Sequence, residues 1–416
     1  RHTRTKAHPS ANEKLTTYPK KKEPEKKEPD KKEYEKEQAQ QERLKAILKG
    51  LANCLARDGQ HENARQTLQE FIGLLKQAND YETLASAQIA LGKTYEVVHQ
   101  HDDALKHYQA AHVSLLKAPH SETPEKSDWW KIWLEIKSAI LCVYYWQGNT
   151  DKMKPILLSV EPIAETIADK KQLIKYYYDQ FQFQLRNKRY SLKSGDLIIP
   201  KKALKTAKQC NNQAILAPVL FMLGIGLVLS NKHLEAKKQL KSALELATTL
   251  QDKILQTRCS TYLSFTFRLI KDIQSTQKYA KQSLVLANET NMVDYIAVAL
   301  ANISWSNFAE GKYKQSSIYL EQSLTQWDCI KTRLEFPFLW LSHLQAIALC
   351  GVNDDFADKY IHQVPNFATI LLDPKQVPLP QDIGQLLLQL SDAANISQRA
   401  SLIEKLTKTA AEHRLL

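Results

Sequence analysis

Glycine and proline are scarce in this sequence, with 11 glycines and 15 prolines among 416 residues. Tight turns depend on these residues, so their scarcity argues against an all-β chain with many hairpins. The six cysteines lie far apart and form no Cys-x-x-Cys pair, which favours free thiols in a reducing compartment over disulfides or a zinc site. No secretory signal opens the chain. We expect an intracellular protein (cytoplasmic, or nuclear if eukaryotic), and Arg1 in place of Met suggests a fragment or processed product.

Long hydrophobic runs are also lacking. The longest uncharged apolar stretch, Ala214–Leu229, contains Pro218, Gly224 and Gly226. It is shorter than the roughly 20 residues that a membrane-spanning helix needs. We therefore expect no membrane span, and we interpret the stretch as a buried helix. The glycine pair follows no strand and precedes no phosphate-binding turn, so it does not indicate a nucleotide site.

Positive charge is in excess, with a formal net charge of +12. Part of it lies in residues 1–29, which are rich in Lys, Glu and Pro and poor in apolar residues. Such a segment cannot bury enough surface to offset its ordering entropy, so we expect a disordered tail. Acidic residues between the lysines cancel much of the field, and no aromatic residues are interleaved for base stacking. We expect no direct binding of nucleic acid.

The most informative pattern begins at Gly92 and continues with Tyr95, Ala104, Tyr108 and Ala111. The first two residues share one face of a helix, and the last three share one face of a second helix. Neither helix can bury its apolar stripe alone, but two antiparallel helices can. Equivalent positions recur along the chain, and five of the seven spacings are 40 residues: Ala52, Gly92, Leu141, Phe181, Gly224, Ser264, Ser304 and Leu344.

The recurrence predicts an all-α chain of about eight helix pairs over residues 30–362. Longer spacings mark insertions at 118–127 and 191–200, in connections that such a stack tolerates. Four prolines indicate a loop over 363–380, and residues 381–416 suggest two helices that cap the end of the stack.

These residues resemble the tetratricopeptide repeat (TPR) superfamily, in which a right-handed α-solenoid is expected. A period of 40 resembles the longer variants of kinesin light chains, of the sensor regions of bacterial signalling ATPases and of cohesin-loader adaptors. The resemblance implies a non-catalytic scaffold or adaptor that binds a partner segment and needs no cofactor or metal. Two alternatives remain open. One is a regulatory or sensor fragment of a larger signalling ATPase or cyclase, and the other is an adaptor subunit of a chromatin-associated complex.

In this superfamily the first helix of each pair lines a concave groove. Aromatic residues next to arginines would suit a protein or peptide partner with acidic and apolar groups. The register carries thirteen residues to the groove: Lys49, Asn53, Arg57, Lys93, Tyr145, Trp146, Tyr178, Arg186, Arg258, Phe265, Arg268, Trp305 and Phe308.

Two other constellations carry less weight. Lys49-x-x-x-Asn53 matches the start of the carboxylate clamp of some TPR domains, but Glu135 stands where that clamp needs a basic residue. His99, His101, His107 and His112 could suggest a metal site, but the first two lie in a predicted solvated turn, so we expect none.

Overall fold

The first helix of each repeat pair forms where the sequence pattern places it. The computed structural model describes residues 31–119, 128–167, 169–330, 338–374, 377–413 and 415–416, of which residues 31–37 are described by their backbone alone. The first helices are α1 (Lys31–Arg57), α3 (Tyr81–Glu96), α5 (Asp128–Trp146), α7 (Lys170–Asn187), α9 (Gln213–Leu229), α11 (Lys253–Leu269), α13 (Val293–Ala309) and α15 (Leu339–Leu349). All eight equivalent positions of the repeat lie in these helices.

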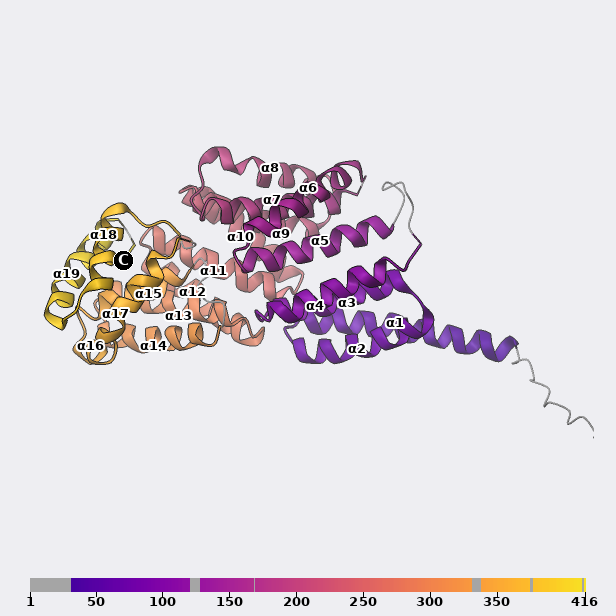
Figure 1. Ribbon diagram of the computed structural model, residues 1–416, viewed down its shortest axis with the longest axis horizontal. Coiled ribbons are helices and arrows are strands. Elements are labelled where there is room, and N and C mark those ends of the chain that lie inside the picture. The colour runs from indigo at the N-terminus through magenta and orange to yellow at the C-terminus, as the bar shows by residue number, and fades with distance from the viewer. Residues whose placement is uncertain (1–30, 120–127, 168, 331–337, 375–376, 414) are drawn as a thin grey trace, which may run out of the picture. The chain divides into compact units, whose positions relative to one another are not determined.

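A second helix follows each of them (Figure 1). The second helices are α2 (His61–Ala78), α4 (His101–Leu115), α6 (Thr150–Thr166), α8 (Ile198–Lys208), α10 (His233–Thr249), α12 (Ile273–Glu289), α14 (Tyr313–Asp328) and α16 (Asp354–Tyr360). The described residues contain no strand. The predicted all-α helical-repeat fold is confirmed.

Small residues let the two helices of a pair approach closely. Ala104, Tyr108 and Ala111 of α4 are fully buried, as are the corresponding Ala236, Leu240 and Ala243 of α10. Serines occupy matching positions in later repeats and hydrogen-bond across the pair. For example, the hydroxyl groups of Ser304 and Ser316 lie 2.9 Å apart. The 40-residue pattern is therefore the pattern of helix contacts.

The turns between helices share a recurring capping pattern. The residue before the helix often has a side-chain oxygen that accepts a backbone N–H in the first turn, as Asp80, Asp252 and Asp272 do. The residue ahead of these caps adopts a positive φ. Asparagine or glycine takes this conformation with little strain and occupies it at Asn79, Asn231, Asn291 and Gly311.

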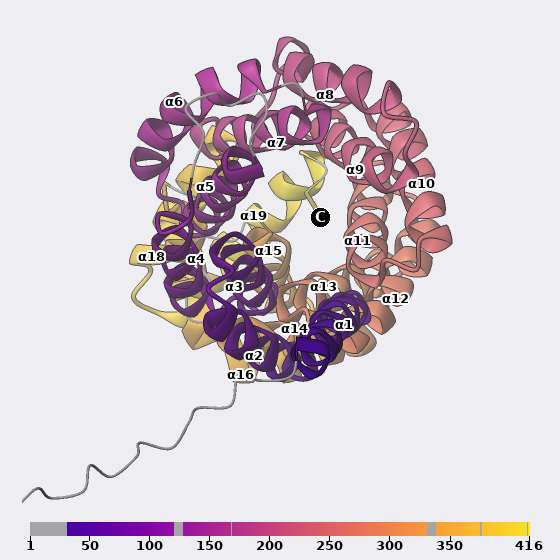
Figure 2. The ribbon, with the colours of Figure 1, turned by 90° about the vertical axis from the view of Figure 1, so that its right-hand side faces the viewer.

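Residues 45–416 form one compact unit, separate from residues 1–44. Within it the helix pairs follow a superhelix, with α3, α5, α7, α9, α11 and α13 on the inside and their partners outside (Figure 2). The helix pairs complete about one turn between α2 and α14. The first helices therefore supply the concave surface.

For two irregular regions, the sequence predictions agree with the structure to different extents. Residues 191–197 of the predicted insertion lie in the connection between α7 and α8 and contain the short helix η2 (Ser194–Leu197), whereas residues 198–200 begin α8. The predicted loop at 363–380 is wrong over much of its length, because α17 (Val364–Leu372) begins there and Pro365 occupies its first turn, where a missing N–H costs nothing. The predicted tail at 1–29 and most of the insertion at 118–127 lie outside the described residues.

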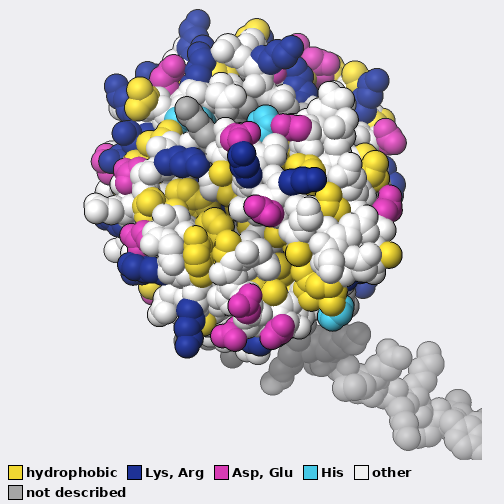
Figure 3. Space-filling view, turned by 90° about the vertical axis from the view of Figure 1, so that its left-hand side faces the viewer, with side chains coloured by type: hydrophobic (Ala, Val, Ile, Leu, Met, Phe, Trp, Pro, Cys, Tyr) yellow, Lys and Arg dark blue, Asp and Glu magenta, His cyan; other side chains and the backbone are white. Residues whose placement is uncertain are grey.

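The C-terminal end of the stack carries α18 (Gln381–Asp392) and α19 (Ile396–Glu412), which follow the turn η4 (Ile361–Gln363) and α17. Hydrophobic side chains gather on this end of the molecule, with charged side chains around them (Figure 3). The exposed apolar residues of these helices include Leu388 and Ile396. The last residues return to the interior, where the carbonyl oxygen of Leu416 accepts a hydrogen bond from Lys271 at 2.7 Å.

Candidate functional site

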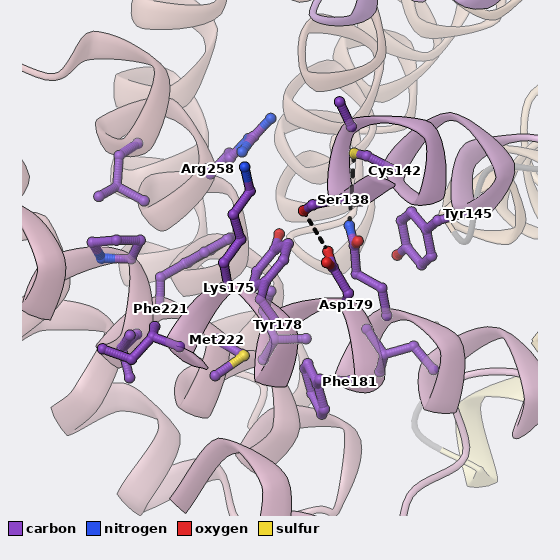
Figure 4. A pocket seen from close by; sticks show the side chains of 18 of the residues that line it. Ser138, Cys142, Tyr145, Lys175, Tyr178, Asp179, Phe181, Phe221, Met222 and Arg258 are labelled. Atoms are coloured by element: carbon purple, nitrogen blue, oxygen red, sulfur yellow. Dashed lines mark hydrogen bonds between the residues drawn. The ribbon is translucent and has the colours of Figure 1, made fainter. Parts of the chain in front are cut away.

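The concave surface contains a cavity of about 380 Å³, lined by α3, α5, α7, α9, α11 and α13 (Figure 4). A cavity of this size falls within the roughly 300–1,000 Å³ range of ligand sites. It lies where the inner helices of six consecutive repeats converge. No single repeat could form it.

Charged side chains from α7 line the cavity beside a polar residue of α5. The Ser138 hydroxyl donates to Asp179 Oδ1 at 2.8 Å. Burial raises the pKa of Asp179 to about 7, although Lys175 and the Ser138 hydrogen bond act against the rise. Burial, helped by the charge of Lys93, lowers the pKa of Lys175 to about 8. Both groups therefore titrate near neutral pH, and a charged ligand would change their protonation.

Glu96 lies at the end of α3 and connects two helices. It accepts a hydrogen bond from the Tyr108 hydroxyl at 2.7 Å and another from the Cys142 thiol at 3.1 Å. Burial and the neighbouring Glu96 carboxylate raise the pKa of Cys142 well above its ordinary value. The thiol is therefore a poor nucleophile, and it serves as a hydrogen-bond donor.

Arg258 reaches the cavity from α11. Its guanidinium hydrogen-bonds Tyr295 of α13, and its Nε is buried with no hydrogen-bond partner. Burial alone would lower the pKa of Arg258, but Tyr295, Tyr178, Cys142 and Glu96 together raise it above its ordinary value. The side chain is a permanent cation with unused donor capacity, and a bound anion could use that capacity.

Much of the remaining lining is apolar. It comes mainly from α9, with a contribution from α7, and includes Phe181, Pro218, Phe221, Met222 and Ile225. Four basic side chains but only two acidic ones line the cavity: Lys93, Lys171, Lys175 and Arg258 against Glu96 and Asp179. The arrangement can hold a group that is anionic on one side and apolar on the other.

The predicted groove residues divide into three sets. The first set lines the cavity and contains Lys93, Tyr145, Trp146, Tyr178 and Arg258. The second set is Lys49, Asn53 and Arg57, which are exposed on α1 and do not line the cavity. The third set is Arg186, Phe265, Arg268, Trp305 and Phe308, which do not line the cavity. Only the first set is brought together around one space.

The third set takes part in packing. Arg186 donates to the carbonyl oxygens of Tyr145 at 2.6 Å and Trp146 at 3.2 Å, closing the end of α5. Arg268 lies over the ring of Trp305 and donates to Asn302 Oδ1 and to the carbonyl of Leu415. Phe265 packs against Phe338 and Trp340, and Phe308 against Tyr313. The returning C-terminal residues therefore cover Arg268.

Sequence reasoning missed several of the polar residues in the cavity, including Glu96, Ser138, Lys175, Asp179 and Tyr295. A usable signal was present on α7, where Lys171, Lys175, Tyr178 and Gln182 share one helical face. Tyr178 was assigned to the groove, and its neighbours one turn away could have been assigned with it. Residues from different repeats that meet here share no local pattern.

The structure also corrects the prediction for the turn that contains His99 and His101. His99 and His101 were predicted to lie in a solvated turn, but both side chains are buried, and the two rings pack against Trp146. Burial lowers the pKa of His101 to about 3, with contributions from His99 and Arg186. Among the residues that the structure describes, no group of three or more His, Cys, Asp or Glu side chains could hold a metal ion.

Solved structures with a similar fold include two helical-repeat proteins. A Rap protein complexed with Competence and Sporulation Factor superposes with a TM-score of 0.54 at 11% identity, covering 80% of this chain and 88% of that chain. A signal transduction ATPase with numerous domains (STAND) and a tetratricopeptide repeat sensor, from Pyrococcus horikoshii, gives 0.50 at 14% identity and covers 79% of this chain. The chain has a tetratricopeptide-like helical-repeat fold.

The match with the STAND protein spans 49% of that chain. No family model and no curated protein matches the sequence. At identities of 11% and 14% the likeness concerns the fold alone. Within the described part of this TPR-like chain, no helix is long and apolar enough to cross a membrane.

Proposed function

We propose that this chain is a non-catalytic protein-interaction scaffold whose cavity holds a partner segment with an acidic group next to apolar side chains. The observation that carries the proposal is the cavity itself. Four basic side chains meet an apolar wall there, and only two carboxylates offset them. Lys175 and Arg258 are partly buried, and an anion beside such cations gains more than it would at the surface, because water screens it less.

A second candidate function is the sensor module of a larger signalling protein. The STAND protein with a tetratricopeptide repeat sensor supports it, since this chain matches about half of that protein. The Rap structure, which contains Competence and Sporulation Factor, supports ligand binding by a fold of this type. Both candidates use the same cavity, and they differ in what binding would control.

The direct test compares two double variants with equal loss of charge. Lys175→Gln with Arg258→Gln removes two cations from the cavity. Lys201→Gln with Lys205→Gln removes two from exposed positions on α8. Each protein is presented with an array of short peptides in which Glu or Asp flanks Leu or Phe, alongside versions with Gln or Asn in place of the acids.

We expect the parent protein and the α8 variant to retain the acidic peptides equally. The cavity variant should lose at least tenfold in affinity, and the amide versions should bind poorly to all three proteins. Equal retention by the two double variants would reject the cavity as the binding site. Preference for basic peptides would reject the proposed ligand chemistry.

A further inference from the structure

The superhelix contacts itself after about one turn. The connection between α1 and α2 meets the end of α12, where His61 Nε2 lies 3.0 Å from the carbonyl oxygen of Thr290. Beside it, Lys253 Nζ lies 2.6 Å from Asp58 Oδ1 and 3.4 Å from Glu289 Oε2. These residues come from the first and sixth repeats, so the contacts join parts of the stack that are distant in sequence.

A second set of contacts extends this junction inward. His99, between α3 and α4, places Nε2 2.9 Å from Asp294 Oδ1 at the start of α13, and both side chains are buried. Val97 packs against an apolar cluster that includes Met292 and Ile296. We refer to residues 58–61 and 97–99, together with Lys253 and residues 289–296, as the seam.

The seam adjoins the cavity. Glu96 lines the cavity and immediately precedes Val97, and Tyr295 lines it and immediately follows Asp294. Separation of the seam would therefore move α3 away from α13 and open one wall. Helices within each repeat would keep their neighbours, because a solenoid is held mainly by contacts between adjacent repeats.

Outside the buried His99–Asp294 pair, the seam is held by weaker contacts than the rest of the stack. The Lys253 ion pairs are partly exposed, and solvent screens such pairs, so each adds little to stability. The apolar contact across the seam is the packing of Val97 on a small cluster within residues 287–300, separate from the large core that runs through residues 134–416. A junction of this kind can open while the helices remain folded.

We propose that the seam is an intramolecular latch that closes the ring of inner helices and controls access to the cavity. The latch depends on the proposed function only for the chemistry of the ligand that enters the cavity. Its opening and closing are properties of the chain alone, and they can be measured without a partner.

Gly59 provides the sharpest test. A Cβ at this position would lie 2.6 Å from Thr290 Cα and 2.8 Å from the Glu289 carbonyl oxygen, so any side chain must push the seam apart. Its φ is +81°, which asparagine tolerates, and the chain itself uses Asn at such turns. Gly311 has a φ of +73° at the corresponding turn between α13 and α14 but meets nothing within 4 Å. Gly59→Asn and Gly311→Asn therefore differ in the clash alone.

The cysteines report on opening. Cys142 lies in the cavity, whereas Cys259 is buried outside it and Cys54 and Cys329 are exposed. Brief treatment with N-ethylmaleimide, followed by mass spectrometry of each cysteine peptide, measures all four rates in one sample. We expect Gly59→Asn to label Cys142 at least fivefold faster with Cys259 unchanged, and Gly311→Asn to change neither. An unchanged Cys142 rate in Gly59→Asn would overturn the latch, as would a rise at Cys259 that matches the rise at Cys142.

Charge reversal gives a second route that needs no clash. Lys253→Glu faces Asp58 and Glu289 with a like charge and should also accelerate Cys142. Adding Asp58→Lys and Glu289→Lys restores opposite charges and should return the rate to that of the parent. Failure of the triple variant to restore slow labelling would reject the latch. If peptides fail to bind while labelling follows these expectations, the proposed function fails and the latch stands.

Discussion

Gly92 and Tyr108 pack so closely that a Cβ on Gly92 would overlap Cε1 of the tyrosine ring. The two residues come from α3 and α4 and lie at the centre of one repeat. Gly224 and Leu240 repeat the relationship in α9 and α10, with a Cβ-to-Cδ2 distance of 2.6 Å. In these two repeats a small residue facing a large one sets how closely the two helices of the pair approach.

Gly92→Ala should therefore destabilise the protein. Forcing a methyl group into this contact costs about 1–3 kcal/mol in similar cores, which exceeds the 0.5–1 kcal/mol that alanine usually gains over glycine in a helix. The matched control is Gly73→Ala in α2, where a Cβ meets nothing within 4 Å. Thermal or urea unfolding should show a loss for Gly92→Ala and a small gain for Gly73→Ala. Equal effects would contradict the packing relationship.

Arg258 and Arg268 should respond differently to substitution, although both were assigned to the groove from the sequence. Arg268→Glu would bury a carboxylate beside Trp305 and the Leu415 carbonyl, at a cost of about 3–5 kcal/mol. Arg258→Gln loses chiefly one hydrogen bond to Tyr295, about 1 kcal/mol. Urea unfolding of the two single variants measures the difference. Similar losses would mean that Arg258 is also a packing residue.

His101 should make the native state less stable in acid. Its pKa is about 3 in the folded protein, against about 6.5 in an unfolded chain. Between these values the unfolded state holds one proton more, so this contribution falls by about 1.4 kcal/mol for each pH unit below 6.5. Relative to the parent protein, His101→Asn should lose less stability on acidification from pH 6.5 to 4.5. A parallel pH profile would show that His101 titrates normally.

Asp179 should act in the opposite direction. Its folded pKa of about 7 exceeds the ordinary unfolded value of about 3.9, so the folded state holds the extra proton in this window. Its stabilising contribution is complete below pH 3.9 and is lost as the pH rises through 7. Compared with the parent, Asp179→Asn should gain stability as the pH rises from 4.5 to 7.5. Denaturant unfolding at several pH values tests this, and an unchanged difference across the range would contradict it.

The fold could be predicted from the sequence because its cause is local. Gly92, Tyr95, Ala104, Tyr108 and Ala111 form one contact between two consecutive helices, and the same offsets recur. The prediction of a loop over 363–380 was wrong for a similarly local reason. Proline was interpreted as a breaker, whereas Pro365 lies in the first helical turn, where it is tolerated.

The site was predicted only in part. The register placed Lys93, Tyr178 and Arg258 on inner helices, and these residues do line the cavity. It gave the same assignment to Arg186 and Arg268, which lie on inner helices but bind the ends of neighbouring segments. The periodicity of the sequence predicts which repeat a residue belongs to and which face of its helix it occupies. It does not predict which residue of another repeat its side chain contacts.

The sequence by itself determined the helices, their pairing and the face that each turns inward, because these depend on residues within about 40 positions of one another. The tertiary structure alone decided that Glu96, Asp179 and Arg258 share one cavity and that His99 meets Asp294 across the seam. These contacts depend on the small rotation between successive repeats. That rotation accumulates over six pairs of helices before the chain meets itself, and no single repeat of the sequence encodes the sum.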